Sequence, residues 1–290
     1  MKIVLSPRIG AFLWMVPAAF AAFALDWPSK EAVLVGNFGS NDRGNPAVGA
    51  SFESDAPIFP ADVGELIFFR DLSNKASRFP SPLGSWTALD HGDGLTGIYG
   101  RYEEREDELP TIVEKETTLA LPGISGWTRR RGFFFSLFDR KERCWINPSL
   151  LISPWEDDRP PVIRHVELRD EAGTAYNPGQ SRNIPQGLYS LYVDAADTVT
   201  GSGESLAPNR ITCSINGTEM GELKFETLIS KDRKRMVNRN GPVPAAEVYG
   251  SYPFFNLGEI QLTRGQAVLV IEAEDIEQNS QAVTYRLTVD

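Results

Sequence analysis

The sequence predicts an all-β fold that consists of two antiparallel β-sheet domains. Short runs rich in β-branched and aromatic residues recur along the chain, and clusters of Gly, Pro, Asn and Asp separate them. Beyond residue 24, no window repeats apolar residues with the 3.6-residue period of a long helix. A stretch rich in proline and charge, residues 153–161, divides the 290-residue chain near its middle.

The first 24 residues have the features of a signal peptide. Two basic residues precede an apolar run at 9–24, and Ala22 and Ala24 place small side chains before a cleavage point. The run is shorter than a membrane span of about 20 residues, and Pro17 interrupts it. We therefore expect removal of residues 1–24 on export. The mature chain would lie in the periplasm or cell envelope and have no transmembrane span.

Residues 25–154 form the first predicted domain. Val, Leu, Phe and Trp fill four short runs that turn residues bound on both sides, which is the pattern of strands that fit a pleated, half-buried surface. The expected strands are residues 32–35, 64–69, 86–89 and 132–138.

Residues 155–161 form a Pro-rich linker, because two prolines follow four charged residues within it. Residues 162–290 then predict an immunoglobulin-like β-sandwich of about seven antiparallel strands. Asn216 and Gly217, between two alternating runs, predict a type I′ hairpin turn. The Cys…Trp…Cys pattern of antibody domains is missing, so only the architecture is predicted. Strands are expected at 162–168, 187–193, 210–215, 222–226, 259–262, 267–273 and 283–289.

Composition limits the partners. The formal charge of −10 and the isoelectric point near 4.9 exclude a nucleic-acid partner, because phosphate binding needs a basic face. Cys144 and Cys213 fall in different predicted domains. They are either free buried thiols or, in an oxidising compartment, a disulfide.

Two turns of the second domain are acidic. Residues 193–198 and 272–276 each follow an apolar strand. Clustered carboxylates are ligands that calcium accepts, but the spacing is not that of an EF-hand. Solvated turns are the alternative interpretation.

The chain has only two histidines, His91 and His165. Catalytic zinc sites use two or three imidazoles that converge on one ion. His165 alternates with apolar residues in the strand at 162–168, which indicates a packing or rim residue. No Ser or Cys has a histidine nearby in sequence that would indicate a dyad, and no Gly-rich phosphate loop is present.

Residues 33–39, 56–67, 84–94 and 145–148 are four short motifs, and their order along the chain resembles that of the lysostaphin/LytM-type metallopeptidases, which cut peptidoglycan cross-bridges. Residues 33–39 resemble the family's opening strand and Phe-Gly turn, and residues 56–67 resemble its "P-V-x-A-x-x-x-G-x-V" hairpin. Residues 84–94 resemble "G-x-x-V-x-I-x-H-G-x-G", and residues 145–148 resemble its closing "V-N-P". The resemblance implies a LytM-like antiparallel sheet over residues 25–154.

The three motifs that carry the family's chemistry are altered. The zinc-binding H-x-G-x-D corresponds to residues 47–51, with Ala47 and Ser51 in the ligand places. Tyr99 begins a Y-x-H motif that ends on Arg101 instead of histidine. The late H-x-H falls in the strand at 132–138, with Phe134 and Ser136 as its equivalents. His91 occupies a turn that supplies no ligand in the family. The resemblance thus implies a degenerate peptidase without metal, cofactor or catalytic residues.

A cleft without zinc could still bind. In the family, a sheet floor and surrounding loops hold an extended peptide stem, and the resemblance points Tyr99 and Arg101 into that groove. Arg129, Arg130 and Arg131 either form a basic rim for an anionic polymer or balance the acidic run at 103–108. The loop at 75–84 either shapes the groove or is a rigid surface turn. The basic segment 231–235 is expected to be an exposed loop.

Three functions follow from these patterns. The first is an exported, non-catalytic peptidase-like protein that binds peptidoglycan, or regulates or positions a cell-wall hydrolase. The second is a structural or assembly protein of the envelope that docks a protein partner. The third is an active zinc metallopeptidase with atypical ligands, which the missing histidines disfavour.

Overall fold

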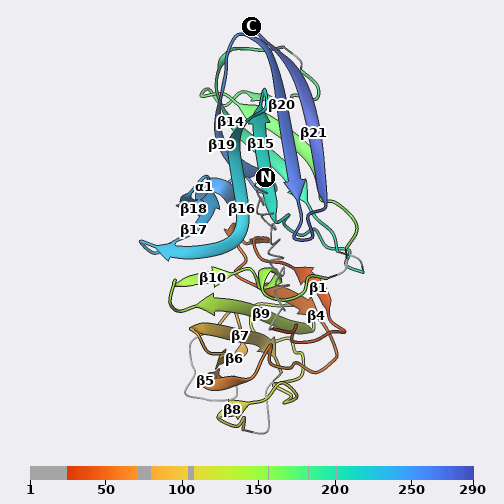
Figure 1. Cartoon of the computed structure of the whole chain (residues 1–290), viewed down its shortest axis with the longest axis vertical. Coiled ribbons are helices and arrows are strands. Elements are labelled where there is room, and N and C mark those ends of the chain that lie inside the picture. The colour runs from red at the N-terminus through yellow and green to blue at the C-terminus, as the bar shows by residue number, and fades with distance from the viewer. Residues whose placement is uncertain (1–24, 71–79, 104–107, 156, 182, 200) are drawn as a thin grey trace, which may run out of the picture.

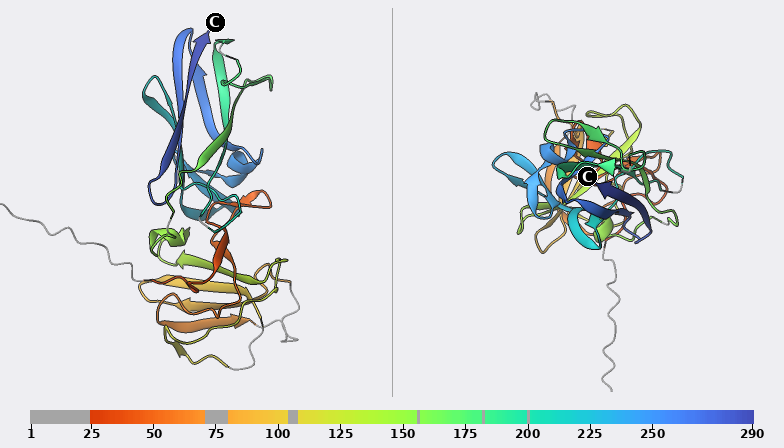
Figure 2. Two further views of the ribbon diagram at one scale, coloured as in Figure 1. Left: turned by 90° about the vertical axis from the view of Figure 1, so that its right-hand side faces the viewer. Right: turned by 90° about the horizontal axis from the view of Figure 1, so that it is seen from above.

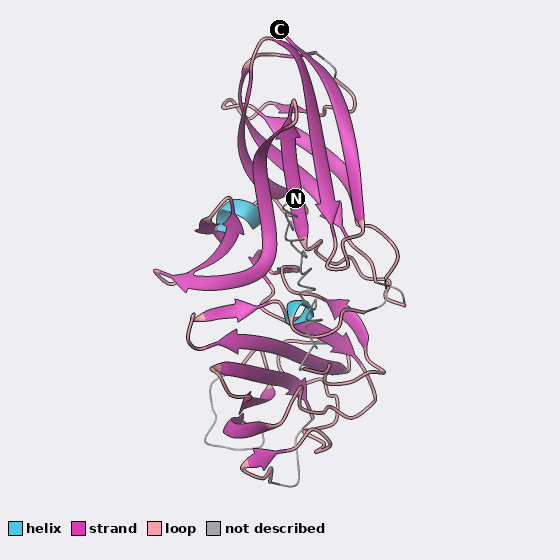
Figure 3. Ribbon diagram, in the orientation of Figure 1, coloured by secondary structure: helices cyan, strands magenta, loops and turns pink. Residues whose placement is uncertain are grey.

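The structure is a computed structural model that describes residues 25–290 except 71–79, 104–107, 156, 182 and 200. The predicted signal peptide lies outside the described residues. Strands dominate the fold, and the helices are the single turns α1 (Ala245–Tyr249) and η1 (Pro148–Leu150) (Figure 3). The all-β prediction is confirmed. Among the described residues, no helix has the length and apolar character needed to cross a bilayer.

The main sheet of the first predicted domain has strands that lie across the long axis of the molecule (Figure 1), and β2 and β3 form a separate two-stranded sheet. The strand order of the main sheet is β10-β9-β7-β6-β5-β8, and β4 joins β1 to β9. The strands are β1 (Val33–Gly36), β2 (Asn41–Asp42), β3 (Asn45–Pro46), β4 (Ala50–Glu53), β5 (Gly64–Arg70), β6 (Ser85–Asp90), β7 (Leu95–Tyr102), β8 (Ile112–Val113), β9 (Gly132–Asp139) and β10 (Cys144–Ile146).

The second predicted domain has two facing sheets, β13-β21-β20-β15-β16 and β12-β11-β14-β19. Their long strands run along the molecule toward the C-terminus at its far end (Figures 1 and 2). The strands are β11 (Val162–Arg169), β12 (Ala175–Tyr176), β13 (Asn183–Ile184), β14 (Gly187–Ala196), β15 (Arg210–Ile215), β16 (Thr218–Lys231), β17 (Lys234–Arg239), β18 (Pro242–Pro244), β19 (Phe255–Leu262), β20 (Gly265–Glu274) and β21 (Ser280–Val289).

Two local features bear on the predictions for the second domain. Asn216 and Gly217 both have positive φ, 51° and 81°, as a type I′ turn between β15 and β16 requires. The expectation of antiparallel pairing holds for the other ladders of these sheets, but β13 pairs with β21 in parallel. A strand of two residues is too short to leave a pattern in the sequence.

Strand β16 links the two sheets. It bends out of the sandwich and pairs with β10 over Thr227–Ile229, where Leu228 lies opposite Trp145. This ladder makes one sheet of fifteen described strands. The two parts of the chain are therefore joined by backbone hydrogen bonds as well as by the linker.

The buried apolar side chains form two cores. One lies among residues 25–152 and also includes Leu206, and the other lies among residues 166–289 and also includes Phe38. Each core therefore includes one side chain from the other half of the sequence. Cys144 and Cys213 are buried and not bonded to each other.

Candidate functional site

A cleft of about 500 Å³ lies between the two parts of the molecule. Its lining includes Ala47, Ser51, Arg101, Phe134 and Ser136, the five positions that the resemblance assigned to the altered metal site. Residues of the predicted second domain also line the cleft, namely Glu204, Ser205, Arg235 and Tyr252. The structure thus brings the five positions together, and it adds a wall that the sequence did not predict.

Strand β9 forms the floor. Its side chains alternate, as the pleat of a strand requires. Phe133, Phe135 and Leu137 enter the first core, whereas Phe134 and Ser136 face the cleft. On one edge of β9, the ladder with β4 ends at Phe135 and the ladder with β10 begins at Leu137. Ser136 lies between these ladders, and its buried Oγ has no hydrogen-bond partner among the described residues.

Ser51 and Ala47 lie beside the floor strand, on the edge where β4 pairs with β9. Ser51 lies in β4 directly opposite Phe134 of β9. Ala47 follows the small β2–β3 hairpin and exchanges backbone hydrogen bonds with its base: Ala47 N donates to Ser40 O at 2.7 Å, and Gly39 N donates to Ala47 O at 3.0 Å. The hairpin therefore holds Ala47 at the cleft, and the β4–β9 ladder holds Ser51 there. A methyl group and one hydroxyl are poor metal ligands.

A β-bulge turns Arg101 into the cleft. Arg101 has φ of 67°, and the β6–β7 register slips there, so that Ser85 pairs with Tyr102 but Trp86 pairs with Gly100. In a regular strand Arg101 would share the core face of Tyr99. The extra residue moves its guanidinium to the other face, while Tyr102 returns to the core.

The Arg101 guanidinium is half-buried and forms no ion pair with any described carboxylate. Its Nη1 donates to Ser51 Oγ at 3.1 Å, and its Cζ lies 5.1 Å from the centre of the Phe134 ring. Its Nε is buried without a hydrogen-bond partner. Burial lowers the pKa of Arg101 from its ordinary value, which Asp42 partly offsets, but an arginine remains charged. The site can therefore accept an anionic group.

Tyr99 does not lie in the cleft. It is fully buried in the first core, where its hydroxyl accepts a hydrogen bond from Ala61 N at 2.8 Å and lies 3.1 Å from His91 Nε2. The expectation that Tyr99 lines the groove is corrected, because the bulge separates the faces of Tyr99 and Arg101. The other ring nitrogen of His91 lies 3.0 Å from Val63 O, so both nitrogens are engaged in the fold.

The three consecutive arginines have separate surroundings. Arg130 lines a second hollow of about 310 Å³ that shares Ser51 and Arg101 with the cleft. It is paired with Glu53 at 2.9 Å and Glu204 at 2.7 Å. Arg131 is paired with Asp55 and with Glu103. Arg129 is exposed and lines neither hollow.

Arg235 was missed by the sequence interpretation. The segment 231–235 is not a loop, because β16 and β17 meet in a two-residue turn at Asp232 and Arg233, both with positive φ. Arg235 lies in β17, lines the cleft and donates to Pro46 O at 2.8 Å. The basic character of residues 231–235 gave no sign of this contact with Pro46.

Two other predicted features are placed in part. Pro82 and Leu83 of the loop at 75–84 line the cleft, whereas residues 75–79 lie outside the described residues. Residues 104–107 of the acidic run also lie outside them. His165 lies in β11 and packs edge-on against Phe254, with ring centres 5.5 Å apart, which fits a packing residue.

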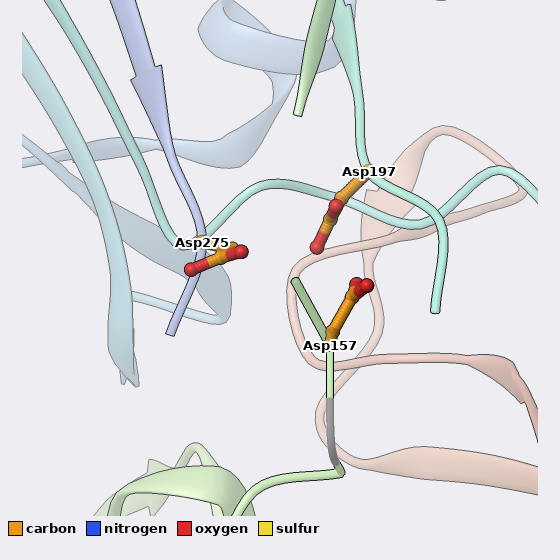
Figure 4. Close-up of side chains that lie close together, drawn as sticks. All are labelled: Asp157, Asp197 and Asp275. Carbon is orange, nitrogen blue, oxygen red and sulfur yellow. The ribbon is translucent and has the colours of Figure 1, made fainter. Parts of the chain in front are cut away.

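Among the described residues, one group of three or more His, Cys, Asp or Glu side chains is close enough to hold a metal ion. It consists of Asp157, Asp197 and Asp275 (Figure 4). None of the three lines the cleft.

The chain matches one protein-family model and several solved structures, and its similarity to these structures is low. One protein-family model, which carries no descriptive name, matches residues 160–290. No curated protein matches the sequence. A mutant catalytic domain of the prophage-encoded M23 protein EnpA from Enterococcus faecalis aligns with a TM-score of 0.34 and 16% identity, covering 41% of this chain and 88% of that chain.

LytU aligns with a TM-score of 0.29 and 14% identity, covering 42% of this chain and 77% of that chain. Lysostaphin from Staphylococcus simulans aligns with a TM-score of 0.35 and 14% identity, covering 71% of this chain and 82% of that chain. At these TM-scores the likeness carries no further conclusion.

Proposed function

We propose that the protein is an exported, non-catalytic relative of lysostaphin/LytM-type metallopeptidases, and that its cleft binds peptidoglycan through carboxylates of the peptide stem. The observation that carries the proposal is the Arg101 guanidinium, which a β-bulge holds over the cleft without a carboxylate partner among the described residues. A half-buried arginine with free donors forms strong charge-assisted hydrogen bonds to carboxylates.

The side chains at the altered motif positions support binding rather than zinc hydrolysis. The five positions that correspond to the altered motifs offer two hydroxyls, one guanidinium, a methyl group and a phenyl ring. Zinc sites use thiolates, imidazoles and carboxylates, and a catalytic site also needs a general base beside the bound water. The guanidinium would repel a dication at the same place.

The shape of the cleft fits an extended ligand. The hollow beside Arg130 continues the cleft past Ser51 and Arg101. Arg130 is already paired with two carboxylates, whereas Arg101 and Arg235 line the cleft without an ion pair to any described carboxylate. Asp42 also lines the cleft and offsets part of their positive charge. We therefore assign recognition to Arg101 and not to the three consecutive arginines.

A pull-down on purified sacculi tests the proposal. The Arg101→Ala variant should be retained at least about tenfold less than the unaltered chain, because a hydrogen bond to a charged group contributes about 1.5–3 kcal/mol. The matched control is Arg129→Ala, which removes an exposed arginine outside the cleft and should leave retention unchanged. Thermal unfolding of both variants checks that they fold.

Equal retention of the Arg101→Ala variant and the unaltered chain would end the proposal. Retention that depends on the second domain alone would favour the envelope-assembly function. A stoichiometric zinc ion that survives dialysis and is lost on substitution of Ser51 and Ser136 would instead favour the peptidase.

A further inference from the structure

Three aspartates meet where the linker passes the second domain. Asp157 belongs to the linker, Asp197 follows β14 and Asp275 follows β20 (Figure 4). One carboxylate oxygen from each lies within 4.8 Å of the others. All three line a cavity of about 40 Å³, which is room for an ion and a water molecule but little more.

The cluster is buried and short of positive charge. The Asp157 side chain is 6% exposed, and Asp197 and Asp275 are 7% and 4% exposed. Among the described residues, the half-exposed Arg159 forms an ion pair with the cluster, and its Nε lies 3.6 Å from Asp157 Oδ1. Glu277 also faces the cavity and accepts a hydrogen bond from Asp157 N. Several carboxylates in a medium of low polarity repel one another unless a proton or a cation intervenes.

Among the described residues, two oxygen atoms at the cavity receive no hydrogen bond. One belongs to a carboxylate and the other to a neutral amide. Asp157 Oδ2 and Asn209 Oδ1 are both buried without a hydrogen-bond partner among the described residues. Both residues line the cavity. Both atoms are hydrogen-bond acceptors, and a buried acceptor without a partner destabilises the fold. A cation in the cavity would satisfy both atoms.

We propose that this cavity, formed by Asp157, Asp197, Asp275 and Asn209, is a calcium site; we name it the junction site. Calcium accepts six to eight oxygen ligands, including carboxylates, amide oxygens and water, in a flexible geometry. Magnesium demands a regular octahedron and retains several waters, for which the cavity has little room. The donor set contains only oxygen, which disfavours zinc.

An ion in the junction site would bind the linker to the sandwich. Asn279 Nδ2 already donates to both Asp157 O and Asp275 Oδ2, at 2.9 and 2.8 Å. The cavity is also lined by Leu34, Phe38 and Trp155 from the part of the chain before the sandwich. An ion bound to Asp157, Asp197 and Asp275 would therefore stabilise the contact between the two parts of the molecule.

Calcium titration of the full mature chain, stripped with a chelator, tests the junction site. Calorimetry should show one calcium ion per chain. At calcium 100 times above Kd, the Tm should rise by about 5–10 °C. The Asp197→Asn variant keeps the acceptor for Thr198 N and should lose at least about tenfold in affinity.

The matched control is Asp194→Asn, three residues earlier on β14, with its carboxylate near Arg164 and outside the cavity. Its affinity for calcium should equal that of the unaltered chain. Absence of heat and of a Tm shift up to about 10 mM calcium, beyond the weak end of extracellular sites, would overturn the proposal. Equal or tighter binding of magnesium, or equal loss in both variants, would also overturn it. Because Asp197→Asn relieves repulsion, its Tm without calcium should not fall.

Discussion

At the scale of single residues, the His91–Tyr99 pair shows how a motif residue can serve the fold instead of chemistry. Tyr99 accepts from Ala61 N, so its own proton is free to bind His91 Nε2, and His91 Nδ1–H can donate to Val63 O. This arrangement uses neutral histidine. The sequence predicted correctly that His91 follows a strand. It did not predict the hydrogen bond between Tyr99 and His91, because in a regular strand Tyr99 and Arg101 would share one face and no sequence signal marks the bulge.

The pair predicts how stability depends on pH. Burial lowers the pKa of His91 below 6.5, although Asp62 and Asp90 oppose the shift. The folded state then binds fewer protons than the unfolded state. The contribution of His91 to stability is therefore complete above pH 6.5 and lost as the pH falls through the lowered folded pKa.

Urea unfolding of the unaltered chain and of the His91→Gln variant measures this effect. The difference between their free energies of unfolding should shrink as the pH is lowered below 6.5. The pKa of Asp197 is raised to about 7, so its contribution to stability is present at low pH and is lost as the pH rises through about 7. This contribution is the same in both proteins and therefore cancels in the difference between their free energies of unfolding. A difference that stays constant from pH 8 to pH 4 would contradict the assigned hydrogen bonds.

At the scale of elements, several of the longer strands could be predicted because apolar runs and turn residues are local signals, but the apolar runs did not predict β4 and β7. The run at 210–215 matches β15, and the run at 132–138 misses only the last residue of β9. The prediction failed where polar residues extend a strand. The run at 222–226 is the centre of β16, which spans Thr218–Lys231 because its ends pair with β15, β10 and β17. Such pairing partners are distant in the sequence.

The bulge in β7 makes a prediction about backbone strain. A residue with φ of 67° suits glycine, costs other residues about 1–2 kcal/mol, and costs β-branched residues more. Arg101→Gly and Arg101→Val both remove the guanidinium. Urea unfolding should find the glycine variant within about 1 kcal/mol of the unaltered chain and the valine variant less stable than the glycine variant by about 2 kcal/mol. Equal stability of the two variants would show that the bulge is absent in solution.

At the scale of the whole molecule, the cleft and the junction site both depend on segments that the sequence keeps far apart. The five cleft positions could be inferred from motif order, but Glu204, Arg235 and Tyr252 could not, because no periodicity reports contacts between domains. The two acidic turns were recognised as calcium candidates. Asp157 was interpreted as part of a solvated linker, yet its side chain is almost fully buried.

The central claim is that Arg101 receives a carboxylate of peptidoglycan in the cleft. Titration of the ¹⁵N-labelled chain from residue 25 onward with soluble stem-peptide fragments, followed by the NMR signal of the Arg101 Nε–H group, measures this contact directly. The account predicts a saturable shift of that signal and of the Ser51 amide, with the Arg129 Nε–H signal unchanged. Shifts confined to the second domain, or no shift at Arg101 under saturation, would contradict it.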